Sequence, residues 1–201
     1  MSGTNSNFNS KVGLRSINVG QFKNKDLSDR RYINKDFSGA DFNFSGSNLS
    51  NTEFFGCDLK GASFQGAKMP KVLFEKSNVV LANFQGANLS KCKVDGSWFN
   101  DADLSGAILD DAKIEGSDFK RVKLVKSKVQ RVFCEDTNFA DSTFEEANFK
   151  AGYFQECDFT DSDFTGIADE VFIIDRCDMS NVIGLSIGGE VRQCKPLPTD
   201  Q

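Results

Sequence analysis

The sequence predicts an all-β protein, built as a coil of short strands in which each turn of the chain pairs with the next. Two observations lead to this prediction. From Ser47 to Ser162 every fifth residue is Ala, Ser, Thr, Cys, Val or Gly, and two places after each of them stands Phe, Leu, Met, Val, Ile or, once, Cys134. A short, exact period outranks the other signals in a sequence, so it is interpreted before helices or strands are assigned.

A period of five fits neither the period of a helix nor the two-residue period of an extended strand. Within each five, the first and third positions point the same way, as in a short stretch of strand, so the second, fourth and fifth positions point outward. The fifth position is often Gly, which suits a tight corner. The sequence therefore predicts short strands joined by corners. Third-position side chains fill the axis, and small first-position side chains lie beside them.

The repeats resemble the motif of the pentapeptide-repeat family, which is a small residue, Asn or Asp, Leu or Phe, and then two polar or small residues. The fives that begin at Ala82 and Ala102 show this motif. The resemblance implies a right-handed, four-sided parallel β-helix with about twenty residues in each coil, and therefore about eight coils here.

Columns of residues twenty apart agree with that coil length, because they form two apolar ladders. One ladder consists of Phe44, Phe64, Phe84, Leu104, Leu124, Phe144 and Phe164. The other consists of Leu59, Val79, Phe99, Phe119, Phe139, Phe159 and Met179. Each coil thus buries the face of its neighbour, as a solenoid requires.

The chain divides into three segments. Residues 1–20 are rich in Ser, Asn and Gly and are expected to form a flexible N-terminal lead-in. Residues 21–184 form the repeat β-helix; its first coil is imperfect because charged residues hold the first positions, as in the atypical cap of a repeat array. A spacing of seven between Phe42 and Leu49 places two extra residues around Asn43 and Phe44, as in a bulge. Residues 185–201 are expected to leave the helix as a C-terminal tail or cap.

Composition favours a single soluble domain in the cytoplasm. There is no apolar run of membrane-spanning length, and the N-terminus has no apolar segment typical of a signal peptide. We therefore expect no membrane partner. The 39% hydrophobic content suffices because one inward ladder system forms the whole core.

The six Cys residues are expected to be reduced core filler, without a metal or cofactor. Four of them occupy first positions, where Ala or Ser should serve equally well. The chain has no His and no pair of Cys separated by two residues, which disfavours zinc, haem and Cys–His catalysis. Cys157 and Cys177 should stack in adjacent coils, but parallel side chains suit a disulfide poorly.

No catalytic residues are predicted. Asp and Asn at second positions follow the repeat, and nothing suggests the desolvated pocket that separates the pKa values of two catalytic carboxyls. No glycine-rich phosphate loop precedes a helix. The chain is therefore expected not to be an enzyme, and its function is expected to lie in outward residues that depart from the repeat.

Those outward residues predict two neighbouring surfaces toward the C-terminal end. Residues 1–100 carry 13 basic and 8 acidic side chains, a net of +5, whereas residues 101–201 carry 11 basic and 21 acidic ones, a net of −10. The predicted acidic edge consists of Glu115, Asp118, Glu135, Asp136, Glu156, Asp158, Asp175 and Asp178. The predicted apolar strip beside it consists of Phe133, Tyr153 and Ile173.

Two functional interpretations remain open, beside the possibility that the acids serve only solubility. The first is an interaction rod that binds a protein partner. The second is a DNA mimic, because duplex DNA carries about one charge per 1.7 Å and two or three acidic rows repeating about every 4.8 Å approach that density. The resemblance supports the second, since some family members are understood to bind type II topoisomerases, namely DNA gyrase or topoisomerase IV, and to protect them from quinolones or toxins. In neither case is the chain expected to bind nucleic acid directly.

The C-terminal end of the rod predicts either a cover or a homodimer. A parallel β-helix leaves an unpaired ladder at each end, which invites edge-to-edge association. Basic side chains blunt the N-terminal end, but the other end is apolar and uncharged. The residues expected there are Val182, Ile183, Leu185 and Ile187.

Overall fold

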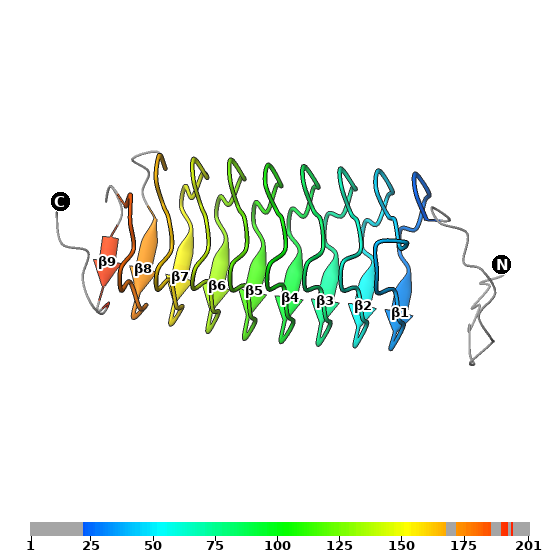
Figure 1. Ribbon diagram of the computed structural model, residues 1–201, viewed down its shortest axis with the longest axis horizontal. Coiled ribbons are helices and arrows are strands. Elements are labelled where there is room, and N and C mark those ends of the chain that lie inside the picture. The colour runs from blue at the N-terminus through cyan, green and yellow to red at the C-terminus, as the bar shows by residue number, and fades with distance from the viewer. Residues whose placement is uncertain (1–21, 168–171, 186–189, 193, 195–201) are drawn as a thin grey trace.

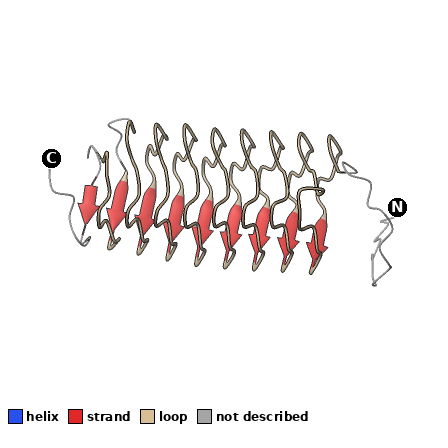
Figure 2. Ribbon diagram, viewed as in Figure 1, coloured by secondary structure: helices blue, strands red, loops and turns tan. Residues whose placement is uncertain are grey.

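The molecule is a straight rod of stacked coils, with the N-terminus at one end and the C-terminus at the other (Figure 1). The computed structural model describes residues 22–167, 172–185, 190–192 and 194. In this part of the chain there is no helix, and all regular structure is strand (Figure 2). The predicted all-β class is confirmed.

A single parallel sheet runs the length of the rod. Within the described residues it has nine strands, ordered along the sheet as they occur in the chain. The face that carries this sheet is called the strand face below. Its strands are β1 Arg31–Ile33, β2 Glu53–Phe55, β3 Leu73–Glu75, β4 Lys93–Asp95, β5 Lys113–Glu115, β6 Phe133–Glu135, β7 Tyr153–Gln155, β8 Ile173–Asp175 and β9 Glu190–Arg192.

The coil length of twenty residues is confirmed by the register. Glu53 pairs with Leu73, and Leu73 with Lys93, each twenty residues on. Three further lines of parallel bridges keep the same step, so each coil touches the next along four sides. They begin with Asp58↔Asn78, Ser63↔Asn83 and Lys68↔Asn88. The line that contains Asp58 marks what we call the second face, which follows the strand face along the chain.

The two extra residues of the first coil lie earlier than predicted. Asp36 pairs with Asp58, a step of 22, whereas Asn43 already pairs with Ser63, a step of 20. The insertion therefore falls between Asp36 and Asn43, not around Asn43 and Phe44. The Phe44 ring keeps its place 4.9 Å from that of Phe64. Removing the interior Phe44 ring from the stack would cost free energy. The two extra residues therefore lie in the exposed corner before it.

The last coil is shorter than the others. Ile173 pairs with Glu190, a step of 17 residues. The segment predicted as a tail or cap therefore does not leave the helix at residues 190–192, because β9 extends the sheet there. The ladder of β8 is covered by this strand.

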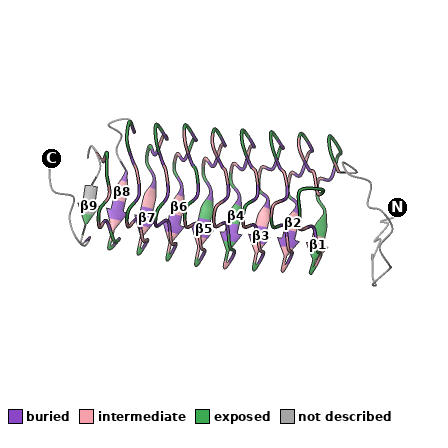
Figure 3. Cartoon of the chain, viewed as in Figure 1, coloured by how far each residue is buried: buried purple, intermediate pink, exposed green. Residues whose placement is uncertain are grey.

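The core contains aromatic stacks on neighbouring sides of the coil, which meet edge-on. Rings on one side lie parallel, as for Phe64 and Phe84 at 4.8 Å, and meet those of the strand face edge-on, as for Phe74 and Phe84 at 88°. In β2 to β8 a buried third-position side chain lies between more exposed neighbours (Figure 3). The predicted inside–outside rule is confirmed over the described coils.

In four of the described coils, one corner depends on a hydroxyl or thiol. At the other three corners the first-position N–H donates to the carbonyl three residues earlier, as from Ala62 to Leu59 at 3.0 Å. After the strand face the N–H donates instead to a side chain of the next coil: Ser77 to Ser97 Oγ at 3.0 Å, and Cys157 to Cys177 Sγ at 3.3 Å. The expectation that Ala would serve equally well for Cys177 was therefore wrong, since Ala cannot accept this bond.

We predict that Ser97→Ala destabilises the rod by about 1–3 kcal/mol, because it leaves the buried Ser77 N–H without its acceptor. Ser97→Cys should retain most of the stability, since Cys occupies the same column at Cys57 and Cys157. Urea denaturation of the three proteins measures the difference. Equal midpoints for the Ala and Cys variants would contradict this role of the side chain.

We also predict that Phe84→Ala lowers the free energy of unfolding by about 3–5 kcal/mol, because it opens a cavity in a fully buried stack. Leu81→Ala is the matched control; Leu81 is 56% exposed, so its truncation should change stability by about 0.5 kcal/mol or less. Denaturation midpoints compare the two. Similar losses would mean that the ring stack is not the main apolar contribution.

Candidate functional site

Second-position acids have a structural role in the corners. The Asp58 carboxylate accepts the Lys60 N–H at 3.1 Å, and the Asp158 carboxylate accepts the Thr160 N–H at 2.9 Å. This is the turn that Asp and Asn favour, in which the side chain binds the backbone two residues on. Asp158 and Asp178 of the predicted acidic edge both have this role.

The acids at the corner between the strand face and the second face have no such role. Asp136 and Glu156 are exposed fifth-position residues with φ of 49° and 54°. The Asp136 carboxylate has no side-chain partner in the described part of the chain. Glu156 pairs with Arg176 at 3.0 Å. The charge of Asp136 is therefore available to a partner, whereas that of Glu156 is partly compensated.

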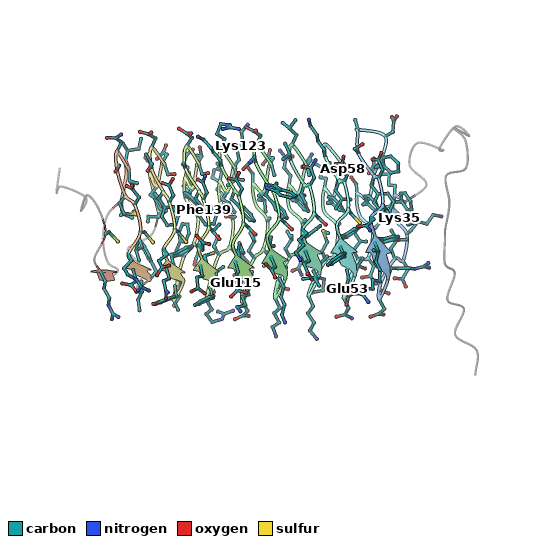
Figure 4. The ribbon with its side chains drawn as sticks, turned by 90° about the horizontal axis from the view of Figure 1, so that it is seen from below. Lys35, Glu53, Asp58, Glu115, Lys123 and Phe139 are labelled. Carbon is teal, nitrogen blue, oxygen red and sulfur yellow. The ribbon has the colours of Figure 1, made fainter. Side chains whose placement is uncertain are left out.

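The acids of the strand face form a row beside this corner. Glu115 pairs in register with Glu135, and Asp175 follows one strand beyond Gln155. Glu115 is bound by Lys113 at 2.7 Å. Figure 4 shows Glu115 on the strand side of the rod and Lys123 on the opposite side.

Arg176 is a residue that sequence reasoning missed. It contacts Glu156 and also Asp175, at 3.4 Å, so it neutralises part of the edge at its C-terminal end. The signal was present, because Arg176 stands twenty residues after Glu156 in the same corner column. The predicted edge is therefore strongest near Asp136 and weaker beyond Glu156.

A hollow of about 350 Å³ lies along this corner. Of the eight predicted acids it brings together four, whereas Glu115, Glu135, Asp175 and Asp178 do not line it. Trp98, 49% exposed, forms one wall and is the second residue that sequence reasoning missed as part of a site. The lining residues are Trp98, Gly116, Ser117, Asp118, Asp136, Thr137, Asn138, Glu156 and Asp158.

Asp118 departs from the pattern of the other second-position acids. The N–H of Lys120, its expected donor, binds Asn100 Oδ1 of the preceding coil at 2.9 Å. Asn100 Nδ2 donates in turn to Asp118 Oδ2 at 2.8 Å. Asp118 Oδ1 is left shielded from solvent without a hydrogen-bond partner. A buried unsatisfied oxygen is costly, so this carboxylate is free of the turn yet held in the wall of the hollow.

The predicted apolar strip forms a continuous contact on β6, β7 and β8. Phe133, Tyr153 and Ile173 pair in register, and the first two rings stack 5.7 Å apart at 6°. Lys113 Nζ lies 5.8 Å from the Phe133 ring. All three strip residues are half-buried. The strip lies on the strand face, and the acidic row separates it from the hollow.

The predicted dimer end is only partly apolar and exposed. Val182 and Leu185 pack against the core, whereas Ile183 is 59% exposed. Ile187 lies outside the described residues. The homodimer remains a prediction.

The cysteines are all buried and free, as the sequence predicted. Burial raises the pKa of the Cys92 thiol to about 12, which leaves it protonated and unreactive at neutral pH. Among the described residues no three Cys, Asp or Glu side chains are placed to hold a metal ion. The described ranges also contain no helix of the length and apolarity that crossing a membrane requires.

The repeats of this chain match those of a known protein family. The family model for pentapeptide repeats matches eight copies over residues 36–75, 82–121 and 130–166, more than half of the chain. The chain belongs to the pentapeptide-repeat family. No curated protein sequence matches it.

Solved structures show the same fold at low identity. The chain is similar to full-length QnrB1, a plasmid-mediated fluoroquinolone resistance protein, with a TM-score of 0.50, 18% identity, and 87% of this chain and 88% of that chain covered. It is also similar to HetL from the cyanobacterium Nostoc sp. strain PCC 7120, a pentapeptide repeat protein involved in heterocyst differentiation regulation. There the TM-score is 0.44, the identity 12% and the coverage 87% of both chains.

We predict that stability falls as the pH is lowered from about 5 to about 2. Hydrogen bonds from Ser38 and Ser180 hold the pKa values of Asp36 and Asp178 below the usual 3.8. Stability from a lowered carboxyl pKa is complete above the unfolded value and is lost as the pH falls through the folded one. Denaturation midpoints across this range measure the loss. The double variant with Ser38→Ala and Ser180→Ala should lose less stability over this pH range. An unchanged loss would contradict the role assigned to these two hydrogen bonds.

Proposed function

We propose that this chain is a non-catalytic interaction rod that binds a basic surface of a protein partner along its acidic edge. The observation that supports this most directly is the pair of corner acids, Asp136 and Glu156, which have no role in the backbone turns. Together with Asp118 they face a hollow instead of plain solvent. On this proposal the rod acts in the cytoplasm.

The acidic edge offers electrostatic attraction, and the neighbouring apolar strip offers contact area. The charged row steers a basic partner, and such steering weakens with salt. The stacked rings of Phe133 and Tyr153 offer a rigid aromatic contact on the same face. A partner that covers the strand face near β6 and β7 would touch both.

The first test compares partner retention by three immobilised proteins. One is unchanged, one has Glu135, Asp136, Glu156 and Asp158 replaced by their amides, and one has Phe133, Tyr153 and Ile173 replaced by Ser. We expect one protein from the native cells to be retained by the unchanged rod, lost at high salt and lost with the amide variant. Loss only with the Ser variant, insensitive to salt, would move the binding site to the apolar strip and overturn the acidic-edge proposal.

A DNA-mimic role is the second candidate, and the regular spacing of the acids favours it. Strand pairing repeats the acidic rows at about 4.8 Å on two neighbouring sides of the corner. QnrB1, which shares the fold, is a fluoroquinolone resistance protein. We propose for this chain that the partner is then a type II topoisomerase, DNA gyrase or topoisomerase IV, whose DNA-binding surface is basic.

A supercoiling assay with purified gyrase tests this candidate, with the rod titrated in the presence and absence of a quinolone. We expect inhibition or drug protection that disappears in the amide variant of Glu135, Asp136, Glu156 and Asp158. The matched control carries the same charge change elsewhere, at Glu145, Glu146, Asp161 and Asp163. No effect of the unchanged rod, or equal loss in both variants, would remove the mimic role.

A further inference from the structure

The hollow at the corner has a defined beginning and end. Trp98 comes from the coil before Gly116 and forms the wall at the N-terminal end of the hollow. Glu156, which pairs with Arg176, and Asp158 line the other end. Coils are about 4.8 Å apart, so the distance from Trp98 to Asp158 is about 14 Å, the length of about four extended residues.

Gly116 keeps the hollow open beside Trp98. Its φ is +53°, and a Cβ placed on it would meet no atom within 4 Å. The same corner position carries Asp136 and Glu156 in the next two coils. The space in front of the indole is therefore empty at Gly116 and bordered by carboxylates beyond it.

The carboxylates around this space are under-compensated. Four line the hollow, and in the described part of the chain only that of Glu156 makes an ion pair. Asp118 Oδ1 additionally lacks any hydrogen-bond partner, because Asn100 has replaced its turn contact. An acidic turn surface would explain Asp158, but it does not explain the exposed indole of Trp98.

We propose that the hollow binds an arginine side chain from an extended segment of the protein partner; this inference rests on the proposed function. The guanidinium stacks on the Trp98 indole and donates to the exposed carboxylate of Asp136. Arginine fits better than lysine because its planar group both stacks on an aromatic face and donates in parallel pairs to carboxylates. A second basic side chain, two residues on and about 7 Å away, meets Asp158.

Trp98 supplies a direct measurement, since it is the single Trp of the chain. The probe is the peptide acetyl-Gly-Arg-Gly-Arg-Gly-amide, titrated at constant ionic strength while Trp fluorescence is followed. We expect a saturable change. The same peptide with neutral citrulline in place of arginine should produce none, and the lysine peptide should bind more weakly.

Two substitutions locate the site. Asp136→Asn should raise the dissociation constant about tenfold, the usual contribution of a charge-assisted hydrogen bond. Asp161→Asn is the matched control, because Asp161 is an exposed corner acid with φ of 57° on a different edge. It should leave binding unchanged. Equal effects of the two substitutions, or a linear response shared by the arginine and citrulline peptides, would overturn the proposal.

The two proposals fail in different ways. If the rod retains a partner through its acids but the arginine peptide leaves Trp98 fluorescence unchanged, the arginine site is wrong and the interaction rod stands. If the peptide binds and Asp136→Asn weakens it, while no partner is retained by the unchanged rod, the arginine site stands and the interaction rod is wrong.

Discussion

The backbone pairing between coils is the constraint on which the rest of the structure depends. Each coil donates and accepts hydrogen bonds along four sides, so a coil must contain twenty residues to stay in register. Coils of a different length occur only where the pairing between coils is not interrupted. The two extra residues of the first coil lie in the exposed corner before Asn43, and the short last coil comes where only β9 follows.

The same pairing between coils distinguishes acids that form backbone turns from acids that form none. A second-position Asp such as Asp158 faces its own corner and accepts a backbone N–H, so its charge is part of the turn. A fifth-position acid such as Asp136 lies where the chain turns with positive φ, and its exposed side chain lines the hollow. Net charge cannot make this distinction, whereas position within the five can.

Charge at the corner is graded along the rod. Gly116 leaves the corner open, Asp136 and Glu156 add negative charge, and Arg176 compensates it. Because Trp98 lies at the open end, an aromatic surface meets the start of the negative stretch. The apolar pair of Phe133 and Tyr153 lies on the adjoining strand face, so a partner of ordinary size contacts a charged and an aromatic region together.

The sequence by itself determined the all-β class and the inside–outside rule, because a period of five repeats the same local choice in every coil. The twenty-residue coil followed from the resemblance to the family, and the apolar columns agreed with it. The sequence also placed Asp118, Asp136, Glu156 and Asp158 on one edge, since residues twenty apart become neighbours. Only the tertiary structure decided that Trp98 walls a hollow and that Asn100 diverts the turn contact of Asp118. These depend on side-chain directions across neighbouring coils, which spacing along the chain does not specify.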